Sequence, residues 1–438
     1  MKNTDLLARS LAAVWHPCTQ MKVHATLPLI PVARARGLWL HDFDGRRYFD
    51  AISSWWVNLF GHAEPRIGAA VAAQLAELEH VMLAGFTHGP VVELSERLTA
   101  LCGGALGHCF YASDGASATE IALKMSMHYW RNRARPEKTG FVSLAGSYHG
   151  ETAGALAVTD IALFRDAYAP LLRAGATVAS PDARRAEPGE SAQSVAERAA
   201  AELETWLARH HAGTAALIVE PLVQCATGMA MYDAHYLRRA RELCSRYEVH
   251  LIADEIAVGC GRTGTFFAHE QAGMRPDFLC LSKGISGGYL PLSVVMTTDA
   301  VYEAFYDDST ARGFLHSHSY TGNALACRAA LATLDIFAAD GVLAANRHRA
   351  ARLGELAAPL ADLPQVRKLR RCGMIVAWDV AGADASYARR LFAAALEHEL
   401  LLRPLGNTVY WMPPYVMDEA DMVWLAERTL RVMQAVAP

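Results

Sequence analysis

Cysteine pairs are missing from this sequence, although nine cysteines are scattered through its 438 residues. No two of them stand in a Cys-x-x-Cys pair, and an odd number cannot close a complete set of disulfides. This pattern argues against a disulfide framework and against a thiolate metal site. We therefore expect a reduced protein without a bound metal.

Long apolar runs are absent as well. No stretch of eighteen consecutive apolar residues occurs, whereas a membrane-spanning helix needs about 20. Asp5 and Arg9 precede only a short apolar patch, which is unlike a secretory signal. These absences predict a cytoplasmic protein with no membrane partner.

Neither sign of charge is in large excess. The sequence has 41 Lys+Arg against 45 Asp+Glu, a net charge of −4, so we expect no nucleic-acid partner. The basic residues at 367–371 are interpreted as a solvated surface face. With 52% hydrophobic residues, the composition is that of a globular enzyme.

Short apolar runs alternate with longer helical patterns in the middle of the chain. The runs are residues 141–144, 216–220, 249–254 and 278–281, and the helical patterns are residues 194–210 and 234–247. Nearly continuous apolar runs are typical of strands buried on both faces of a parallel sheet. The alternation predicts an α/β fold with a doubly wound sheet.

The length of the chain favours two domains rather than one core. We predict a large domain at residues 66–325 that carries the sheet. Helical patterns followed by strand candidates at 374–380 and 408–412 predict a smaller α+β domain at residues 326–438. Residues 1–65 are expected to join it and contain a hairpin at Asp44-Gly45.

Two motifs fit the phosphate and the ring of a planar anionic cofactor. Residues 113–117 place small side chains at the start of a helix, where unpaired amides and the helix dipole favour an anion. Tyr148 lies in a loop just after a buried strand, where an aromatic ring could cover a planar cofactor. Taken alone, the first motif suits an ordinary capped helix and the second a packed loop.

Two charged residues complete the pattern. Asp254 ends a very apolar strand, where a carboxylate needs a cation or donors, and a pyridinium N–H would serve. Lys283 leaves another buried strand into a glycine-rich loop, where desolvation would lower the pKa of its amine and free it for Schiff-base chemistry. The four motifs in this order are far more specific than any one of them.

Segments around these residues resemble the class III aminotransferases of the fold-type I pyridoxal phosphate enzymes. The resemblance is strongest at residues 251–256, 261–264, 276–277 and 281–283, and extends from Trp15 to Tyr415. It implies a large domain with a mostly parallel sheet covered by helices and a smaller α+β domain. It also implies pyridoxal 5'-phosphate as cofactor and a homodimer with shared active sites.

The resemblance assigns roles residue by residue. Lys283, Tyr148 and Asp254 would be catalytic, with Lys283 holding the cofactor as a Schiff base and moving the proton. The cofactor-binding residues would be Gly115 and Ala116 at the phosphate, Tyr148 on the ring, Asp254 at the ring nitrogen, Gln224 near the ring hydroxyl, Lys283, His318 and Ser319. Ser319 falls where the family usually has a threonine that reaches the phosphate of the partner subunit.

Further segments resemble the branch of this family that acts in biotin biosynthesis. They are residues 15–21, 53–56, 148–152, 314–323 and 412–415. This implies ping-pong transfer of an amino group from S-adenosylmethionine to 8-amino-7-oxononanoate, giving 7,8-diaminononanoate. The implied substrate contacts are Trp55, Tyr148, Lys283, Ser317, Arg403 and Tyr410.

Other interpretations remain open at this level. Cys18 stands where the branch often has a tyrosine, and Glu151 where it often has an aspartate, so lysine is an alternative donor. Another class III ω-amino acid aminotransferase, or a binding protein that kept the fold, is also compatible. Residues 259–264 match Gly-x-Gly-x-x-Gly, but a nucleotide-binding oxidoreductase needs a helix to open there, and residues 265–267 lack helical periodicity.

Overall fold

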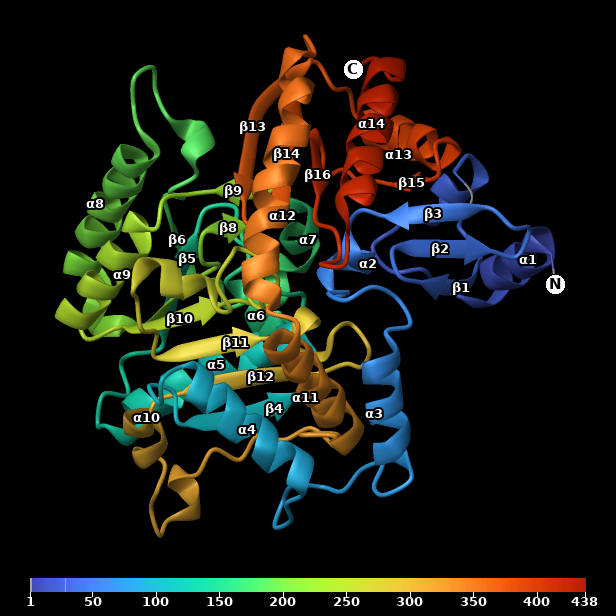
Figure 1. Ribbon diagram of the computed structural model, residues 1–438. Coiled ribbons are helices and arrows are strands. Elements are labelled where there is room, and N and C mark those ends of the chain that lie inside the picture. The colour runs from blue at the N-terminus through green and yellow to red at the C-terminus, as the bar shows by residue number, and fades with distance from the viewer. Residues whose placement is uncertain (1, 28) are drawn as a thin grey trace. The chain divides into compact units, whose positions relative to one another are not determined.

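The computed structural model describes residues 2–27 and 29–438 (Figure 1). The chain folds into two compact units. Unit 1 comprises Met1–Pro65 and His348–Pro438, and unit 2 comprises Arg66–Arg347. Each unit has its own sheets, and the cofactor-binding motifs predicted from the sequence fall in unit 2.

Unit 2 extends further along the chain than the predicted boundary after residue 325. The helix α11 (Ala324–Ala339) belongs to it, because it packs against α4 (Gly89–Leu101) and the 3-10 turn η6 (Lys283–Ser286). Most side chains of α11 are buried, and many are alanines that allow close helix packing. The change of composition after residue 322 therefore marks a core helix of unit 2 rather than a domain boundary.

A seven-stranded sheet forms the centre of unit 2, in the order β4-β12-β11-β10-β7-β5-β6. Its strands are β4 (His108–Ala112), β5 (Gly140–Leu144), β6 (Ala176–Val178), β7 (Thr214–Val219), β10 (His250–Asp254), β11 (Phe278–Leu281) and β12 (Ser293–Thr297). All pairings except those of β12 are parallel. The apolar runs read from the sequence are confirmed as strands, and the doubly wound α/β class is confirmed with them.

Helices supply the rest of the core of unit 2. They are α3 (Pro65–Leu75), α4, α5 (Gly115–Asn132), α6 (Ala153–Ala157), α7 (Ala162–Arg165), α8 (Ala192–His210), α9 (His235–Arg246), α10 (Asp299–Glu303) and α11. Every residue of β7, β10, β11 and β12 is buried, so both faces of the sheet are covered. Figure 1 shows the sheet surrounded by these helices. Apolar residues of α5 join those of the central strands in one cluster, and this burial is the main stabilising contribution.

Shorter elements connect the main ones in unit 2. They are the strands β8 (Val223–Gln224) and β9 (Ala230–Met231), and the 3-10 turns η2 (Asp166–Leu171), η3 (Ala183–Arg185), η4 (His211–Gly213), η5 (Ala268–Ala272), η6 and η7 (Thr310–Arg312). The helix α12 (Val342–Ala357) crosses from unit 2 into unit 1 at Arg347.

Unit 1 contains two smaller sheets. One has the order β1-β2-β3-β15 and the other the order β13-β14-β16. The strands are β1 (Val32–Arg36), β2 (Trp39–Asp42), β3 (Arg47–Asp50), β13 (Val366–Cys372), β14 (Ile375–Val380), β15 (Leu400–Leu401) and β16 (Thr408–Trp411). The predicted hairpin is confirmed, since β2 and β3 pair antiparallel and Gly45 in their turn has a φ of 92°.

Helices and a buried pair of tryptophans complete unit 1. The helical elements are α1 (Asn3–Ala13), η1 (Met21–Ala25), α2 (Ser53–Trp56), η8 (Ala358–Asp362), α13 (Tyr387–Glu397) and α14 (Glu419–Ala435). Trp378 and Trp411 are fully buried and meet edge to face at 5.5 Å, an arrangement that aromatic rings favour.

No single helix of the described chain is both long and apolar enough to cross a membrane. One bent pair, Ala324–Ala339 with Val342–Asp362, meets the length and composition requirements when its two helices are taken together.

Candidate functional site

Five predicted or newly found residues lie at one edge of the large sheet. Gly115, Tyr148, Glu220, Asp254 and Lys283 follow or end the strands β4, β5, β7, β10 and β11. Because β5, β7, β10 and β11 run parallel, their carboxyl ends meet at the same edge (Figure 1). Ligands of open α/β sheets bind at this edge.

The first turn of α5 provides a cradle for an anion. Asp114 caps the helix, with its Oδ1 accepting from Ser117 N at 2.9 Å and its Oδ2 from Ser117 Oγ at 2.7 Å. Gly115 and Ala116 are the first residues of the helix, where backbone N–H groups have no partner within the helix. A Cβ on Gly115 would lie 2.9 Å from the side chain of Ile256, so a larger residue does not fit.

Asp254 is 4% exposed and has a specific partner. Its Oδ2 is 2.7 Å from His149 Nδ1, and its Oδ1 accepts from Ile256 N at 3.1 Å. An ionised carboxylate can only accept, so His149 Nδ1 carries the proton of this bond. The carboxylate is thereby held in place, where it could accept from a protonated ring nitrogen.

His149 was missed in the sequence, where only its neighbour Tyr148 received a role. Its side chain is fully buried. The sequence alone does not indicate that a histidine in a loop is buried. The loop after β5 thus supplies both the predicted aromatic ring and the residue that orients Asp254.

Lys283 begins η6 with a φ of 46°. This left-handed conformation is uncommon for a residue with a side chain and is often found at functional sites. Desolvation lowers the pKa of the Lys283 ammonium, against the opposing attraction of Asp254, Cys225 and Glu220. More of the neutral amine is therefore available for attack on a carbonyl.

Glu220 is a second buried carboxylate that the sequence did not single out. It is 6% exposed, and its two oxygens accept from Tyr148 N at 3.0 Å and Cys225 N at 3.1 Å. Burial raises the pKa of Glu220 to about 7, with His149 lowering it and Asp254 raising it. Glu220 therefore ties the Tyr148 loop to the end of β7.

The raised pKa of Glu220 predicts a pH-dependent stability. Between pH 4.5, near the pKa of Glu220 in the unfolded chain, and about pH 7, the folded protein keeps Glu220 protonated while the unfolded chain does not. This difference contributes up to about 3 kcal/mol to the free energy of unfolding. The contribution is fully present below pH 4.5 and is lost as the pH rises through 7. Glu220→Gln should flatten the pH dependence of the free energy of unfolding of the cofactor-free protein across that window. Parallel curves for the two proteins would contradict it.

Tyr148 and Gln224, the other residues predicted to contact the cofactor ring, are hydrogen-bonded to neighbouring residues. The Tyr148 hydroxyl donates to Glu151 Oε1 at 2.9 Å, so Glu151 acts directly on this residue. Gln224 is fully buried on β8; its Nε2 donates to Ala145 O at 3.1 Å and its Oε1 accepts from Ser180 Oγ. Tyr148 is thus fixed within the loop that follows β5, and Gln224 is fixed against the start of that loop.

Three predicted residues lie in a separate loop. Ser317 and Ser319 are not buried, and Ser319 O accepts from His80 Nε2 at 2.7 Å. His318 Nε2 is 2.9 Å from His316 Nε2, whose other ring nitrogen is 2.7 Å from Lys124 Nζ on α5. The structure thus joins this loop to α5 and to the segment before α4.

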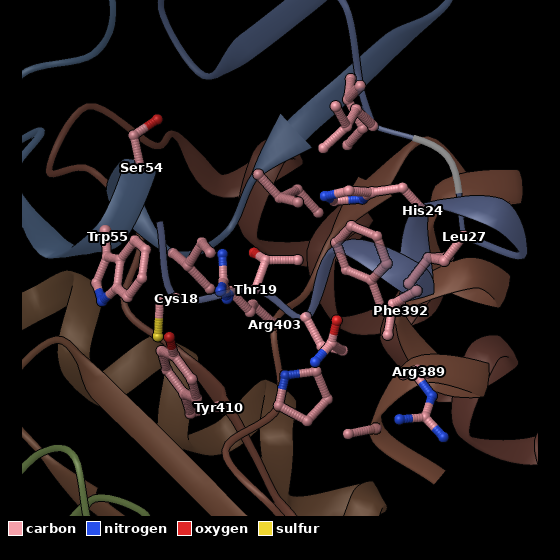
Figure 2. Close-up of a pocket in the computed structure, with 18 residues that line it drawn as sticks. Cys18, Thr19, His24, Leu27, Ser54, Trp55, Arg389, Phe392, Arg403 and Tyr410 are labelled. Carbon is pink, nitrogen blue, oxygen red and sulfur yellow. The ribbon is translucent and has the colours of Figure 1, made fainter. Parts of the chain in front are cut away.

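Three further predicted residues line a pocket of about 610 Å³ in unit 1. Trp55, Arg403 and Tyr410 gather at one end with Cys18, as Figure 2 shows, and His24 and Phe392 lie at the other end. The Arg403 guanidinium carbon lies 4.4 Å from the centre of the Trp55 ring. A cation stacked on an aromatic wall is suited to a ligand with an apolar chain and a carboxylate.

The glycine motif at residues 259–264 does not open a helix. It forms successive turns, and the next element is the 3-10 turn η5 (Ala268–Ala272). Glu255 holds that turn, accepting from Ala268 N at 2.6 Å and from His269 N at 2.8 Å. The geometry of a dinucleotide-binding motif is therefore not formed by these residues.

Comparisons with known proteins agree with this geometry. Residues 20–433 match the family described as aminotransferase class III. The chain is 45% identical to an adenosylmethionine-8-amino-7-oxononanoate aminotransferase of Helicobacter pylori, over 95% of each protein.

Two solved structures are similar over nearly the whole chain. The aminotransferase of the same name from Methanocaldococcus jannaschii has a TM-score of 0.94 and 30% identity, covering 100% of both chains. An amine transaminase from an uncultivated Pseudomonas species, with pyridoxal phosphate bound, has a TM-score of 0.92 and 30% identity, covering 97% of this chain and 99% of that one.

This chain belongs to the class III aminotransferases. It is a transferase whose cofactor is pyridoxal phosphate. The residues at the sheet edge fit that group: a helix start with small side chains for the phosphate, a buried and oriented carboxylate for the ring nitrogen, and a desolvated lysine for the aldehyde.

Proposed function

We propose that this enzyme transfers an amino group from S-adenosylmethionine to 8-amino-7-oxononanoate, giving 7,8-diaminononanoate in biotin biosynthesis. The similarity to relatives that bear this substrate in their names carries the proposal. The pocket of unit 1 supports it, because Arg403 beside Trp55 suits an aliphatic keto acid. We also propose that the enzyme is located in the cytoplasm.

Within the proposed reaction, the cofactor supplies an electron sink that stabilises the carbanion formed next to nitrogen. Asp254, oriented by His149, keeps the ring nitrogen protonated. The Lys283 amine would act as the base, taking the proton from the donor carbon and holding it for transfer. Gly115 and Ala116 would hold the phosphate, and Tyr148 and Gln224 would hold the ring.

For the substrate, we assign the carboxylate to Arg403 and the aliphatic chain to Trp55 and Tyr410. A guanidinium binds a carboxylate with two parallel hydrogen bonds, and an aromatic wall removes methylene groups from water. Tyr148, Lys283 and Ser317 would contact the reacting end of the substrate.

The enzyme is proposed to act as a homodimer in which Ser319 and His318 reach the partner's cofactor. The loop that bears them exposes large apolar side chains, with Leu315 at 79% and Tyr320 at 64%. Phe86, which is 56% exposed, lies in the segment before α4. His80 of the same segment contacts Ser319 O of the loop. Apolar side chains this exposed are typical of a surface that a second subunit covers.

Product formation with different donors tests the function. The purified protein is given 8-amino-7-oxononanoate with S-adenosylmethionine, with lysine, or with an ω-amino acid, and diamine formation is measured. Diamine with S-adenosylmethionine and parallel double-reciprocal lines are expected. If diamine formed only with lysine, lysine would replace S-adenosylmethionine as the proposed donor. If the protein transferred amino groups from ω-amino acids to pyruvate and formed no diamine, it would be the alternative class III ω-amino acid aminotransferase.

Arg403→Ala is expected to raise KM for 8-amino-7-oxononanoate by about 30-fold, since a charge-assisted pair contributes about 2 kcal/mol. The value of kcat should change little, because the carboxylate is remote from the reacting carbon. Arg403→Lys should recover only part of the loss, as it keeps the charge without the planar fork. An unchanged KM in Arg403→Ala, with a raised KM in Arg389→Ala, would place the carboxylate at the opposite end of the pocket.

A further inference from the structure

Four consecutive residues of unit 1, Ser53–Trp56, have positive φ angles of 51°, 45°, 71° and 73°. Residues with side chains rarely adopt this left-handed conformation, because Cβ crowds the next carbonyl. A run of four without a glycine is strained, and strain persists only where neighbouring contacts enforce it. Trp55, within this run, is 42% exposed and lines the pocket.

Asp50 makes the contacts that enforce the turn. It is fully buried, and its Oδ1 accepts from Ile52 N at 3.3 Å and Ser54 N at 3.0 Å. Its Oδ2 accepts from Ser54 Oγ at 2.8 Å and lies 2.9 Å from His62 Nε2. Since an ionised carboxylate only accepts, His62 donates, and Asp50 has four donors for its two oxygens.

The residues on both sides of Trp55 are anchored as well. Ser53 Oγ donates to Met412 O at 2.7 Å, and Trp56 Nε1 donates to Tyr410 Oη at 3.0 Å. Trp55 is thus presented from a turn whose neighbouring side chains are fixed inside unit 1. Figure 2 shows Trp55 on the pocket with Ser54 next to it in the chain.

We propose that Asp50 and His62 are positioning residues that set substrate specificity by holding Trp55 in the left-handed turn. This rests on the proposed function, in which Trp55 faces the aliphatic chain of 8-amino-7-oxononanoate. Neither residue is among the described residues that line the pocket. Both therefore act through Trp55 rather than by touching the substrate.

Asp50→Asn tests the proposal directly. The amide removes the negative charge and turns one acceptor into a donor, so the charge-assisted bonds that hold the turn are weakened. We expect KM for 8-amino-7-oxononanoate to rise about tenfold while kcat stays within about twofold, which is the result of losing substrate binding alone. The visible absorption of the bound cofactor should be unchanged. A fall in kcat with an unchanged KM would overturn the proposal.

Two further sets of variants separate positioning from general damage. His62→Ala should raise the same KM about threefold, and His62→Gln should restore most of it, because the glutamine amide can donate to Asp50. In a Trp55→Ala background, Asp50→Asn should have no further effect on KM. If Asp50→Asn raised KM by the same factor with and without Trp55, Asp50 would not act through Trp55.

Asp42 offers a matched control. It is 5% exposed, lies on β2 of the same unit, and also accepts from four donors. The donors are Asn3 Nδ2, Asp44 N, Arg46 N and Tyr48 Oη. Asp42→Asn should lower Tm about as much as the test variant and leave KM unchanged. An equal rise in KM would attribute the effect to loss of stability in unit 1.

Hydrogen exchange of residues 50–57 in the cofactor-loaded enzyme gives a readout independent of substrate. The Ser54 amide, bonded to Asp50, should exchange at least about tenfold faster in Asp50→Asn than in the wild type. Unchanged exchange would overturn the positioning role. If the wild type converts no 8-amino-7-oxononanoate with any donor, the proposed function fails, and the exchange result still decides whether Asp50 holds the turn.

Discussion

Lys283→Ala is expected to lower kcat by more than about 10⁴-fold, because we propose this amine as both the attachment point of the cofactor and the base that moves the proton. The variant should also lose the visible absorption of the lysine-bound cofactor. The structure supports both roles: Lys283 lies at the edge of the sheet, next to the charges of Asp254 and Glu220, and its pKa is lowered by desolvation.

Lys138 supplies the control for this experiment, because it is a fully buried lysine of unit 2 outside the site. Its Nζ donates to three backbone carbonyls, those of His211, Thr214 and Glu248, at 2.6–2.9 Å. Lys138→Met should lower Tm, since three buried acceptors lose their donor. The variant should keep the absorption and kcat per folded molecule. Normal transamination in Lys283→Ala, measured at saturating donor, would contradict the assignment of the catalytic lysine.

Much of the fold can be predicted from the sequence because it depends on local patterns. Continuous apolar runs specify strands buried on both faces, and β7, β10 and β11 appear where these runs occur. The Asp44-Gly45 turn is specified by its own two residues. The end of unit 2 is different, because α11 belongs to the unit through packing on α4 and η6, which no local pattern reveals.

The candidate site shows the same division. Asp254 and Lys283 are recognisable because a charge at the end of an apolar strand is unusual in itself. His149 contacts Asp254, which lies 105 positions further along the chain, and Glu220 contacts Tyr148, which lies 72 positions before it. Such partners become visible only when the strands are assembled into a sheet.

The left-handed turn at Ser53–Trp56 is the least predictable feature. Glycine usually marks a positive φ in a sequence, and this segment has none. The conformation is imposed by Asp50 and by contacts with Met412 and Tyr410, more than 350 positions further along the chain. Local propensity therefore points away from the structure that forms, as expected where function takes precedence over local preference.

Asp254→Asn is expected to lower kcat by about 10²–10³-fold, as losing a group that stabilises charge in the transition state does. Asparagine cannot balance the positive charge of a protonated ring nitrogen, so the carbanion is stabilised less. His149→Ala should have a smaller effect of the same kind, about tenfold, because the carboxylate remains but loses the donor at 2.7 Å that orients it. Both variants should also raise the dissociation constant of pyridoxal phosphate.

The next residue of the chain provides the comparison that interprets this result. Glu255 is buried and paired with His269 Nδ1 at 2.7 Å, much as Asp254 is paired with His149. Glu255 also holds η5, so His269→Ala should lower Tm at least as much as His149→Ala does, while cofactor affinity and kcat stay near the wild-type values. If both histidine variants weakened the cofactor equally, burial of a charged pair would explain the effect. A selective loss in His149→Ala assigns it to the orientation of Asp254 toward the ring nitrogen.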